Sequence, residues 1–254
     1  MSTEFYDTNA WVGLWPLAPL GHADLTTLRR HWRKHGINGG LVSSLDAIWL
    51  INPHDHNARL IESTRKGSGV DPLPILNLLD PAWKQELGQL MADPSVKAVR
   101  LVPGYGGWKM NNPAAVAAAK EITAQGRRVV LTVRLVDERQ EHPAIKVKPA
   151  KAAAIARWID KVPGMQPLIQ GLSRWEVEEL AKATDCFITD LSFFEWDDSL
   201  GVLGKVVDLK RAVFGSLTPF HVTQAHQNKI TMSPSASPAR RKAVAAGNAL
   251  RWLK

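Results

Sequence analysis

The sequence predicts an α/β fold, most consistent with a (β/α)8 TIM barrel. Short apolar segments alternate with helical segments along the 254 residues, and eight such units fit the length that this barrel needs. The apolar segments are mostly continuous, as expected for parallel strands buried on both faces. A doubly wound open sheet is the alternative, but it would usually carry a glycine-rich first turn, and Gly13-Leu-Trp-Pro16 follows the first strand.

The elements follow one another in strand–helix order. The expected strands are Phe5–Val12, Gly40–Leu45, Leu73–Leu78, Val96–Val102, Arg128–Leu135, Pro167–Leu172, Cys186–Leu191 and Ala212–Leu217. The expected helices are Ala23–His35, His54–Arg65, Pro81–Met91, Ala114–Gln125, Pro149–Val162, Ser173–Ala183, Ser199–Leu209 and a basic C-terminal helix, Ala239–Leu253. No break in composition marks a second domain, so we expect residues 1–254 to form a single TIM-barrel domain.

Helix boundaries carry recognisable signals. Asp80 precedes Pro81, and Asn112 precedes Pro113, each pair giving an N-cap followed by proline in the first turn. Ser173 with Glu176 three residues later has the capping-box pattern, in which side chain and backbone cap each other. These signals predict helix starts after Asp80, Asn112 and Ser173.

Composition and charge exclude several classes of protein. Ten Trp and 45% hydrophobic residues exclude low-complexity disorder, and a single cysteine excludes a disulfide scaffold. No apolar run approaches the roughly 18 residues of a membrane span, and the first ten residues lack a signal-peptide pattern, so we expect a cytoplasmic protein with no membrane partner. The net charge of +8 comes from eight cations beyond Asp208, without a nucleic-acid motif, so we expect no nucleic-acid partner.

Functional groups of a TIM barrel gather where strands end. Arg100, Arg134 and Arg139 follow or end two neighbouring strands, and guanidinium groups suit carboxylate or phosphate. Their convergence would bind a small anionic molecule. The alternative is that they form structural ion pairs with Asp137, Asp190 or Glu195 at the barrel rim.

Acid–base candidates lie in and near the segment Arg134–His142. Histidine has an ordinary pKa near neutral pH, so His142 is a candidate to carry a proton. Asp137 would either orient His142 or act as the acid or base itself. The alternative is an exposed polar loop. His54-Asp-His56 has the spacing of a pair of metal ligands, but we interpret it as the polar start of a helix. Cys186 lies inside an apolar predicted strand, so we interpret it as a small core residue.

Tryptophan is concentrated near the predicted strand ends, at Trp11, Trp15, Trp108 and Trp196. These side chains would either form an aromatic wall for a ring-bearing substrate or seal the barrel core. We interpret Trp175 and the remaining tryptophans as core residues.

Four segments in order resemble the amidohydrolase superfamily, specifically its amidohydrolase-related branch of decarboxylases and hydrolases. They are Tyr6–Trp11, Val99–Pro103, Phe214–Pro219 and Asn248–Leu253. The resemblance spans nearly the whole chain and implies a distorted TIM barrel that hydrolyses or decarboxylates a small carboxylated substrate. It also implies a homo-oligomer, since dimers are common in such families.

The resemblance further implies a divalent metal held by histidines on strands 1, 5 and 6 and an aspartate on strand 8. Here the corresponding residues are Asn9 and Trp11, the stretch 132–134, Gln170 and Leu217. Indole and isobutyl groups cannot coordinate a metal, and amide oxygens are weak zinc ligands. We therefore expect no cofactor and no metal bound in the family's manner.

Three functional interpretations follow. The first is a metal-independent hydrolase or lyase in which Asp137, His142 or Asp190 does acid–base work, while Asn9, Trp11, Arg100, Arg134, Arg139 and Gln170 bind the substrate. The second is a non-catalytic barrel that binds an anionic ligand or a partner, with a mouth plugged by tryptophan. The third is a metallohydrolase with relocated ligands, drawn from Asp7, Asp190, Glu195 and His142.

Overall fold

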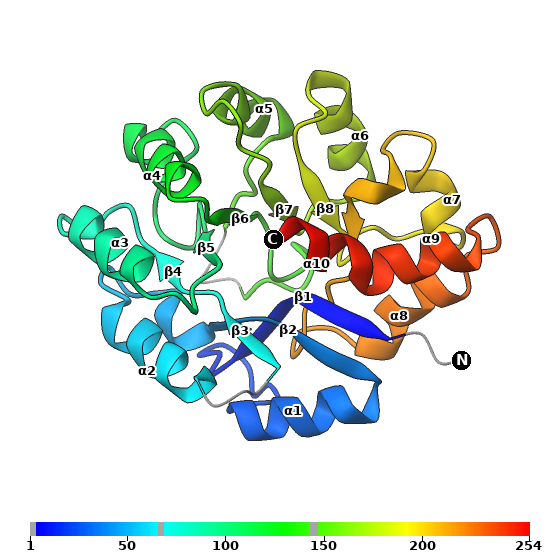
Figure 1. Cartoon of the computed structure of the whole chain (residues 1–254), viewed down its shortest axis with the longest axis horizontal. Helices are drawn as coiled ribbons and strands as arrows, with labels where there is room; N and C mark the ends of the chain where they lie inside the picture. The colour runs from blue at the N-terminus through cyan, green and yellow to red at the C-terminus, as the bar shows by residue number, and fades with distance from the viewer. Residues whose placement is uncertain (1–3, 66–68, 143–146) are drawn as a thin grey trace.

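The fold was analysed in a computed structural model, which describes residues 4–65, 69–142 and 147–254. Parallel strands form a ring, and the helices that follow them lie around it in chain order (Figure 1). The strands are β1 (Phe5–Val12), β2 (Ile37–Ser44), β3 (Val70–Pro72), β4 (Ile75–Leu76), β5 (Ala98–Leu101), β6 (Arg128–Thr132), β7 (Leu168–Gln170), β8 (Ile188–Asp190) and β9 (Ala212–Val213). The predicted α/β TIM-barrel architecture is confirmed.

The ladder of the ring is interrupted at two places. The sheets are β1-β2-β3 and β4-β5-β6-β7-β8-β9. The third strand, predicted at Leu73–Leu78, begins earlier and is divided into β3 and β4 by Leu73-Pro74, since proline has no N–H to donate to a neighbouring strand. On the other side, Thr8 donates its N–H to Phe214 (3.0 Å) and Trp11 donates to Thr218 (3.0 Å), so hydrogen bonds rather than a regular ladder join β1 to the last strand.

The helices between the strands are α1 (Leu25–Lys34), α2 (His54–Thr64), α3 (Trp83–Ala92), α4 (Pro113–Ala124), α5 (Ala152–Asp160), α6 (Arg174–Ala183) and α7 (Ser199–Leu203), with short 3₁₀ turns at Leu45–Ala47 and Leu209–Arg211. The Asn112 cap and the Ser173–Glu176 capping box form as predicted. Asp80 accepts a hydrogen bond from Ala82 N (2.8 Å), and its helix begins later than predicted.

The C-terminal segment consists of α8 (Thr223–Thr231), α9 (Pro238–Lys242), a π-helical turn (Ala243–Gly247) and α10 (Asn248–Trp252). The last helix passes over the middle of the ring (Figure 1). There, Ala249 and Trp252 pack against a layer of strand residues that includes Tyr6, Ala98 and Leu168, all near strand starts. The C-terminal helix thus closes the amino-terminal end of the barrel.

Two predictions about burial are wrong. Cys186 is exposed, because strand β8 begins two residues later than predicted and leaves the cysteine in the preceding turn. Trp175 is 67% exposed: it lies in the first turn of α6, on the face that points to solvent. Among the described residues, no helix combines the length and apolar character that crossing a bilayer requires.

Candidate functional site

The strands place a layer of polar side chains inside the barrel. Side chains alternate along a strand, so the residue two positions after an inward-facing one also faces inward. Ala98 is followed in this way by Arg100, Val130 by Thr132, Leu168 by Gln170, and Ile188 by Asp190. Four neighbouring strands therefore bring one polar side chain each to a single level above the apolar floor.

Hydrogen bonds connect this layer with strand β1. Asn9 donates from Nδ2 to Asp190 Oδ2 (2.9 Å), and its Oδ1 accepts from Trp11 Nε1 (2.9 Å). Gln170 donates to the Thr8 carbonyl (2.6 Å) and accepts from the Thr132 hydroxyl (3.0 Å). Five residues that the sequence nominates, Asn9, Trp11, Arg100, Gln170 and Asp190, are thus brought together.

These five side chains are completely enclosed, each with 0% exposure. The Arg100 guanidinium carbon lies 3.8 Å from the centroid of the Trp11 ring, and its Nη2 is 3.5 Å from Asn9 Oδ1. Burial raises the pKa of Asp190. Burial also lowers the pKa of Arg100, whereas the charges of Asp190 and Asp7 act to raise it. The layer is a packed polar core with an internal cation, and none of its five side chains is exposed to solvent.

The residues at the expected metal positions do not fit a divalent cation. Asn9 and Gln170 already use their amide groups in hydrogen bonds inside the layer. Trp11 and Leu217 have no atom that can coordinate a metal ion, and the Arg100 cation lies against Asn9 and Trp11. A second cation there would be repelled. The described ranges contain no group of three or more His, Cys, Asp or Glu side chains suited to hold a metal ion.

The residues nominated as relocated metal ligands lie apart. Asp7 accepts hydrogen bonds from the Ser216 backbone N–H (2.9 Å) and from its hydroxyl (2.5 Å), in the seam between β1 and β9. Glu195 accepts from Lys229 Nζ (2.7 Å), and the Glu195 side chain is exposed. Neither carboxylate shares a site with His142, which lies at the barrel mouth.

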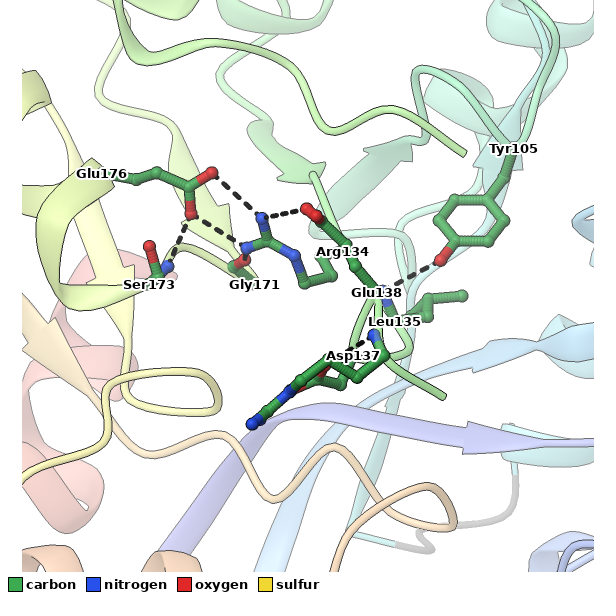
Figure 2. A network of polar contacts seen from close by, with 9 residues as sticks. Tyr105, Arg134, Leu135, Asp137, Glu138, Gly171, Ser173 and Glu176 are labelled. Carbon is green, nitrogen blue, oxygen red and sulfur yellow. Dashed lines mark hydrogen bonds and ion pairs between the residues drawn. The ribbon is translucent and has the colours of Figure 1, made fainter. Parts of the chain in front are cut away.

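Arg134 has its guanidinium fully engaged by neighbouring groups (Figure 2). It donates from both terminal nitrogens to Glu176 (2.9 and 3.0 Å), from Nη1 to the Gly171 carbonyl (2.7 Å) and from Nη2 to Glu138 (3.2 Å). The bond to Arg134 and the capping bond to Ser173 lower the pKa of Glu176 against the effect of burial. The sequence left structural ion pairs as the alternative to ligand binding. Arg134 does form such pairs, but with Glu176 and Glu138 and not with the predicted partners Asp137, Asp190 or Glu195.

Asp137 and Arg139 form a second, exposed pair. Arg139 donates from Nε and Nη2 to the two oxygens of Asp137 (2.9 and 2.7 Å), and the arginine side chain is 88% exposed. Hydrogen bonds from Arg139 lower the pKa of Asp137 to about 2. The carboxylate therefore stays ionised and hydrogen-bonded at neutral pH, a poor starting state for a proton carrier.

A cavity of about 400 Å³ lies at the carboxyl end of the barrel, between the loops that follow β1, β5, β6 and the last strand. Trp15, Tyr105 and Phe220 form aromatic walls, with the Trp15 ring 5.1 Å from that of Phe220 and 6.3 Å from that of Tyr105. Leu135 adds apolar surface. We call this space the mouth cavity. Its aromatic walls belong to the same apolar cluster as Trp11, which lies between the cavity and the polar core.

The mouth cavity also contains titratable side chains, Glu141, His142 and His221. Burial raises the pKa of Glu141. Burial, together with the nearby Lys229 ammonium, lowers the pKa of His221, whose Nδ1 is 3.1 Å from His226 Nε2. One group is thus biased toward its protonated form and another toward its neutral base form.

Sequence reasoning identified His142 but missed Glu141, His221, Tyr105 and Phe220. Glu141 lies in the segment Arg134–His142, in which His142 and Asp137 are the predicted acid–base residues. His221 and Phe220 come just after the last strand, where the rule that strand ends carry function selects them as well. Tyr105 lies in the glycine-rich segment 104–108 after β5, where no sequence pattern indicates that its ring lines a cavity.

A comparison with protein-family models finds no match, and a comparison with curated proteins finds none either. Solved structures do match over nearly the whole chain. A 2,6-dihydroxybenzoate decarboxylase from Rhizobium gives a TM-score of 0.76 at 14% identity, covering 99% of both chains.

Two further structures show the same likeness. The 5-carboxyvanillate decarboxylase of Sphingomonas paucimobilis gives 0.75 at 12% identity, with 99% of both chains covered. A dihydroxybenzoic acid decarboxylase from Polaromonas sp. JS666, with bound manganese and 2-nitroresorcinol, gives 0.75 at 12% identity, covering 99% of this chain and 97% of that one. The chain therefore shares the TIM-barrel fold of these decarboxylases.

Proposed function

We propose that the protein is a lyase that decarboxylates a small aromatic carboxylate in the mouth cavity, without a metal ion. The observation that carries the proposal is the combination, in one cavity, of aromatic walls with Glu141, His142 and His221. The structural neighbours named as decarboxylases of hydroxybenzoate and carboxyvanillate support the substrate class.

The cavity suits a single aromatic ring. Its volume of about 400 Å³ falls within the range of small-molecule sites, and Trp15, Tyr105 and Phe220 offer offset and edge contacts to a flat ring. Burial raises the pKa of Tyr105 to about 12, so its phenol stays neutral. The described residues that line the cavity include neither Arg nor Lys, so His142 and His221 are the groups that would meet the carboxylate.

Decarboxylation needs one proton and no water in the bond-breaking step. The ring carbon that bears the carboxylate takes up a proton from Glu141, whose raised pKa favours the acid form. The bond from that carbon to the carboxyl carbon then breaks, its electron pair restores the aromatic ring, and CO₂ leaves. Glu141 is reprotonated from water. Metal independence rests on the donor set of the polar core, which does not suit a cation.

This assignment places catalysis away from most of the residues nominated by the sequence. His142 stays in the site, but it binds the substrate carboxylate instead of carrying the proton. Asp137 and Asp190 take structural roles, the first paired with Arg139 and the second enclosed beside Asn9. Hydrolysis of a carboxylated ester or lactone would use the same groups, with His221 as the base for water, and is the less favoured alternative because the named structural neighbours are decarboxylases.

A second candidate function is ligand binding without turnover. The polar core is sealed by Trp11 and the residues around it, which is the plugged mouth expected of a non-catalytic barrel. In that case the mouth cavity binds an aromatic acid, and Glu141 serves only to shape it.

One experiment separates these functions. Purified protein, treated with chelator and then divided into samples with and without Mn²⁺, is titrated with 2,6-dihydroxybenzoate and assayed for resorcinol and CO₂. We expect binding and metal-free turnover. The Glu141→Gln variant should lower kcat by about 100-fold or more, whereas Glu179→Gln, on the exposed face of α6, should leave it unchanged.

The other outcomes are equally clear. Binding without product in every sample supports the non-catalytic barrel. Turnover only with Mn²⁺ overturns metal independence. Absence of binding to 2,6-dihydroxybenzoate and to a panel of other hydroxybenzoates overturns the assignment of the mouth cavity.

A further inference from the structure

A second cavity, of about 530 Å³, lies outside the mouth cavity at the same end of the barrel. It is formed by the loop after β5 and by the segment 147–157, which leads into α5 and includes its first turns. Tyr105 lines the mouth cavity, whereas the neighbouring Gly104 lines this one, so a single turn separates the two spaces. We call it the loop cavity.

The loop cavity has a strongly one-sided charge. Among the described residues, its lining includes the cations Lys109, Lys148, Lys151 and Arg157 and no acidic residue. All four side chains belong to exposed residues, and none has a hydrogen bond or ion pair with another described residue. Some exposed cations elsewhere on the protein are paired, as Arg139 is with Asp137. Four unpaired cations around one hollow repel each other and are relieved by an anion.

The start of α5 adds to this positive field. Its N-cap is Lys151, which forms no side-chain capping bond, whereas Asn112 caps α4 and Ser173 caps α6. A helix amino terminus presents unsatisfied N–H groups and a positive dipole end, so a lysine there is unfavourable unless an anion is near. This helix is nine residues long, and its opening turn faces the cavity through Ala153 and Ala154.

Apart from Asn111, the rest of the described lining is apolar or glycine. It includes Trp108, Met110, Val147, Pro149 and Ala150. Trp108 is 3% exposed, and its Nε1–H has no hydrogen-bond acceptor among the described residues. An apolar wall next to cations favours an anion that also has an apolar part. A bare inorganic ion would leave the apolar surface exposed to water.

We propose that the loop cavity is a second ligand site that binds a small amphipathic organic anion, with the carboxylate or phosphate head at Lys148, Lys151 and the start of α5, and the apolar body against Trp108 and Met110. The site is independent of the chemistry proposed for the mouth cavity, because none of its lining residues is Glu141, His142 or His221.

Isothermal titration of the full chain with octanoate, octyl phosphate, inorganic phosphate and octanol tests the proposal. We expect octanoate and octyl phosphate to bind, and inorganic phosphate and octanol to bind at least about tenfold more weakly, since each lacks one half of the recognition. The tighter of the two amphiphiles identifies the head group.

Variants locate the binding. The double variant Lys148→Glu, Lys151→Glu should weaken both amphiphiles by about tenfold or more, and Ala153→Leu should weaken them by filling the cavity. Lys120→Glu, an exposed charge reversal on α4 that lies outside the lining, should not change either affinity. Circular dichroism and thermal melting confirm that each variant is folded.

Three results would overturn the assignment. The first is that neither amphiphile binds. The second is that inorganic phosphate binds as tightly as octyl phosphate, which would show that the apolar wall does not contribute to binding. The third is unchanged affinity in the double variant and in Ala153→Leu, while Trp15→Ala abolishes binding, which places the amphiphile in the mouth cavity instead.

Discussion

Arg100 and Trp11 are stacked in the centre of the barrel, with the guanidinium carbon 3.8 Å from the indole centroid and both side chains at 0% exposure. Nε and Nη1 of this arginine have no hydrogen-bond acceptor among the described residues. The charge is therefore balanced by the electron-rich ring and by Asp190 and Asp7, not by a full set of hydrogen bonds. The core is organised around an internal cation supplied by the chain itself.

Replacing Arg100 by Met should destabilise the protein strongly. The change leaves Asp190 and Asp7 buried without their cation, and breaking a buried charge cluster from one side costs about 3–5 kcal/mol. Urea denaturation followed by circular dichroism measures the loss. Arg139→Met, which removes an arginine that is 88% exposed, should leave the free energy of unfolding nearly unchanged. Equal effects of the two variants would refute the role of Arg100.

The Arg134–Glu176 pair should make stability depend on acid. Its partner Arg134 holds the pKa of Glu176 below the ordinary value near 4.5, so the pair stabilises the fold above that value and the contribution is lost as pH falls through the lowered pKa. Glu176→Gln should cost about 2 kcal/mol at pH 7 and flatten this acid-side slope.

The matched control for that change is Glu179→Gln, on the exposed face of the same helix. Free energies of unfolding measured from pH 3 to pH 7 should show the wild-type slope for the control. A Glu176→Gln protein with the same slope as the wild type would show that the pair contributes nothing to acid stability.

Binding of an aromatic carboxylate in the mouth cavity should take up protons. The free protein holds the pKa of His221 below 6.5, so the ring is largely neutral at pH 7, and a bound carboxylate nearby raises that pKa. Affinity for 2,6-dihydroxybenzoate should rise as pH falls from 7.5 to 6. Calorimetry in buffers of different ionisation enthalpy should give a fraction of a proton taken up per ligand. His221→Gln should abolish the uptake and His56→Gln should preserve it.

The histidine cluster at α1, formed by His22, His31 and His35, should weaken the fold in mild acid. His31 lies between His22 and His35, with ring centroids 4.3 and 4.5 Å away, and its Nε2 is 2.7 Å from the Thr223 hydroxyl. Burial and these neighbours lower the pKa of His31 to about 4. A neutral histidine of this kind stabilises the fold above pH 6.5, and the contribution is lost as pH falls from 6.5 toward 4.

Thermal melting between pH 7 and pH 4 tests this expectation with His31→Gln, which keeps a hydrogen-bonding group near Thr223. The variant should lose less stability over this interval than the wild type. If both proteins lose the same amount, the acid sensitivity belongs to other groups, such as His226, whose pKa burial lowers to about 2.

Local patterns were sufficient to predict the architecture and much of the polar core. Continuous apolar runs located the strands, and strict alternation along them places Arg100, Gln170 and Asp190 at one level. These are near-neighbour properties, fixed by the backbone geometry of a strand. The Ser173–Glu176 capping box is local for the same reason and formed as predicted.

Whether the predicted site residues are free to bind a ligand could not be predicted from local sequence patterns. Arg134 looked free to bind an anion, but Glu176, which the sequence indicates only as a capping residue, reaches it across 42 positions. Arg100, Asn9 and Asp190 lie together as the strand-end rule indicates, yet Trp11 and its neighbours close them off from the mouth.

By itself the sequence determined the strand–helix order, the barrel class and the level at which polar residues face inward, because these depend on periodicity within each segment. Only the tertiary structure decided which of those residues meet solvent. Loops after β1, β5, β6 and the last strand pack together from positions far apart in the chain, and that packing sealed the polar core and opened the mouth cavity beside Glu141 and His221. Long-range packing depends on the shapes of all these loops at once, which no single segment encodes.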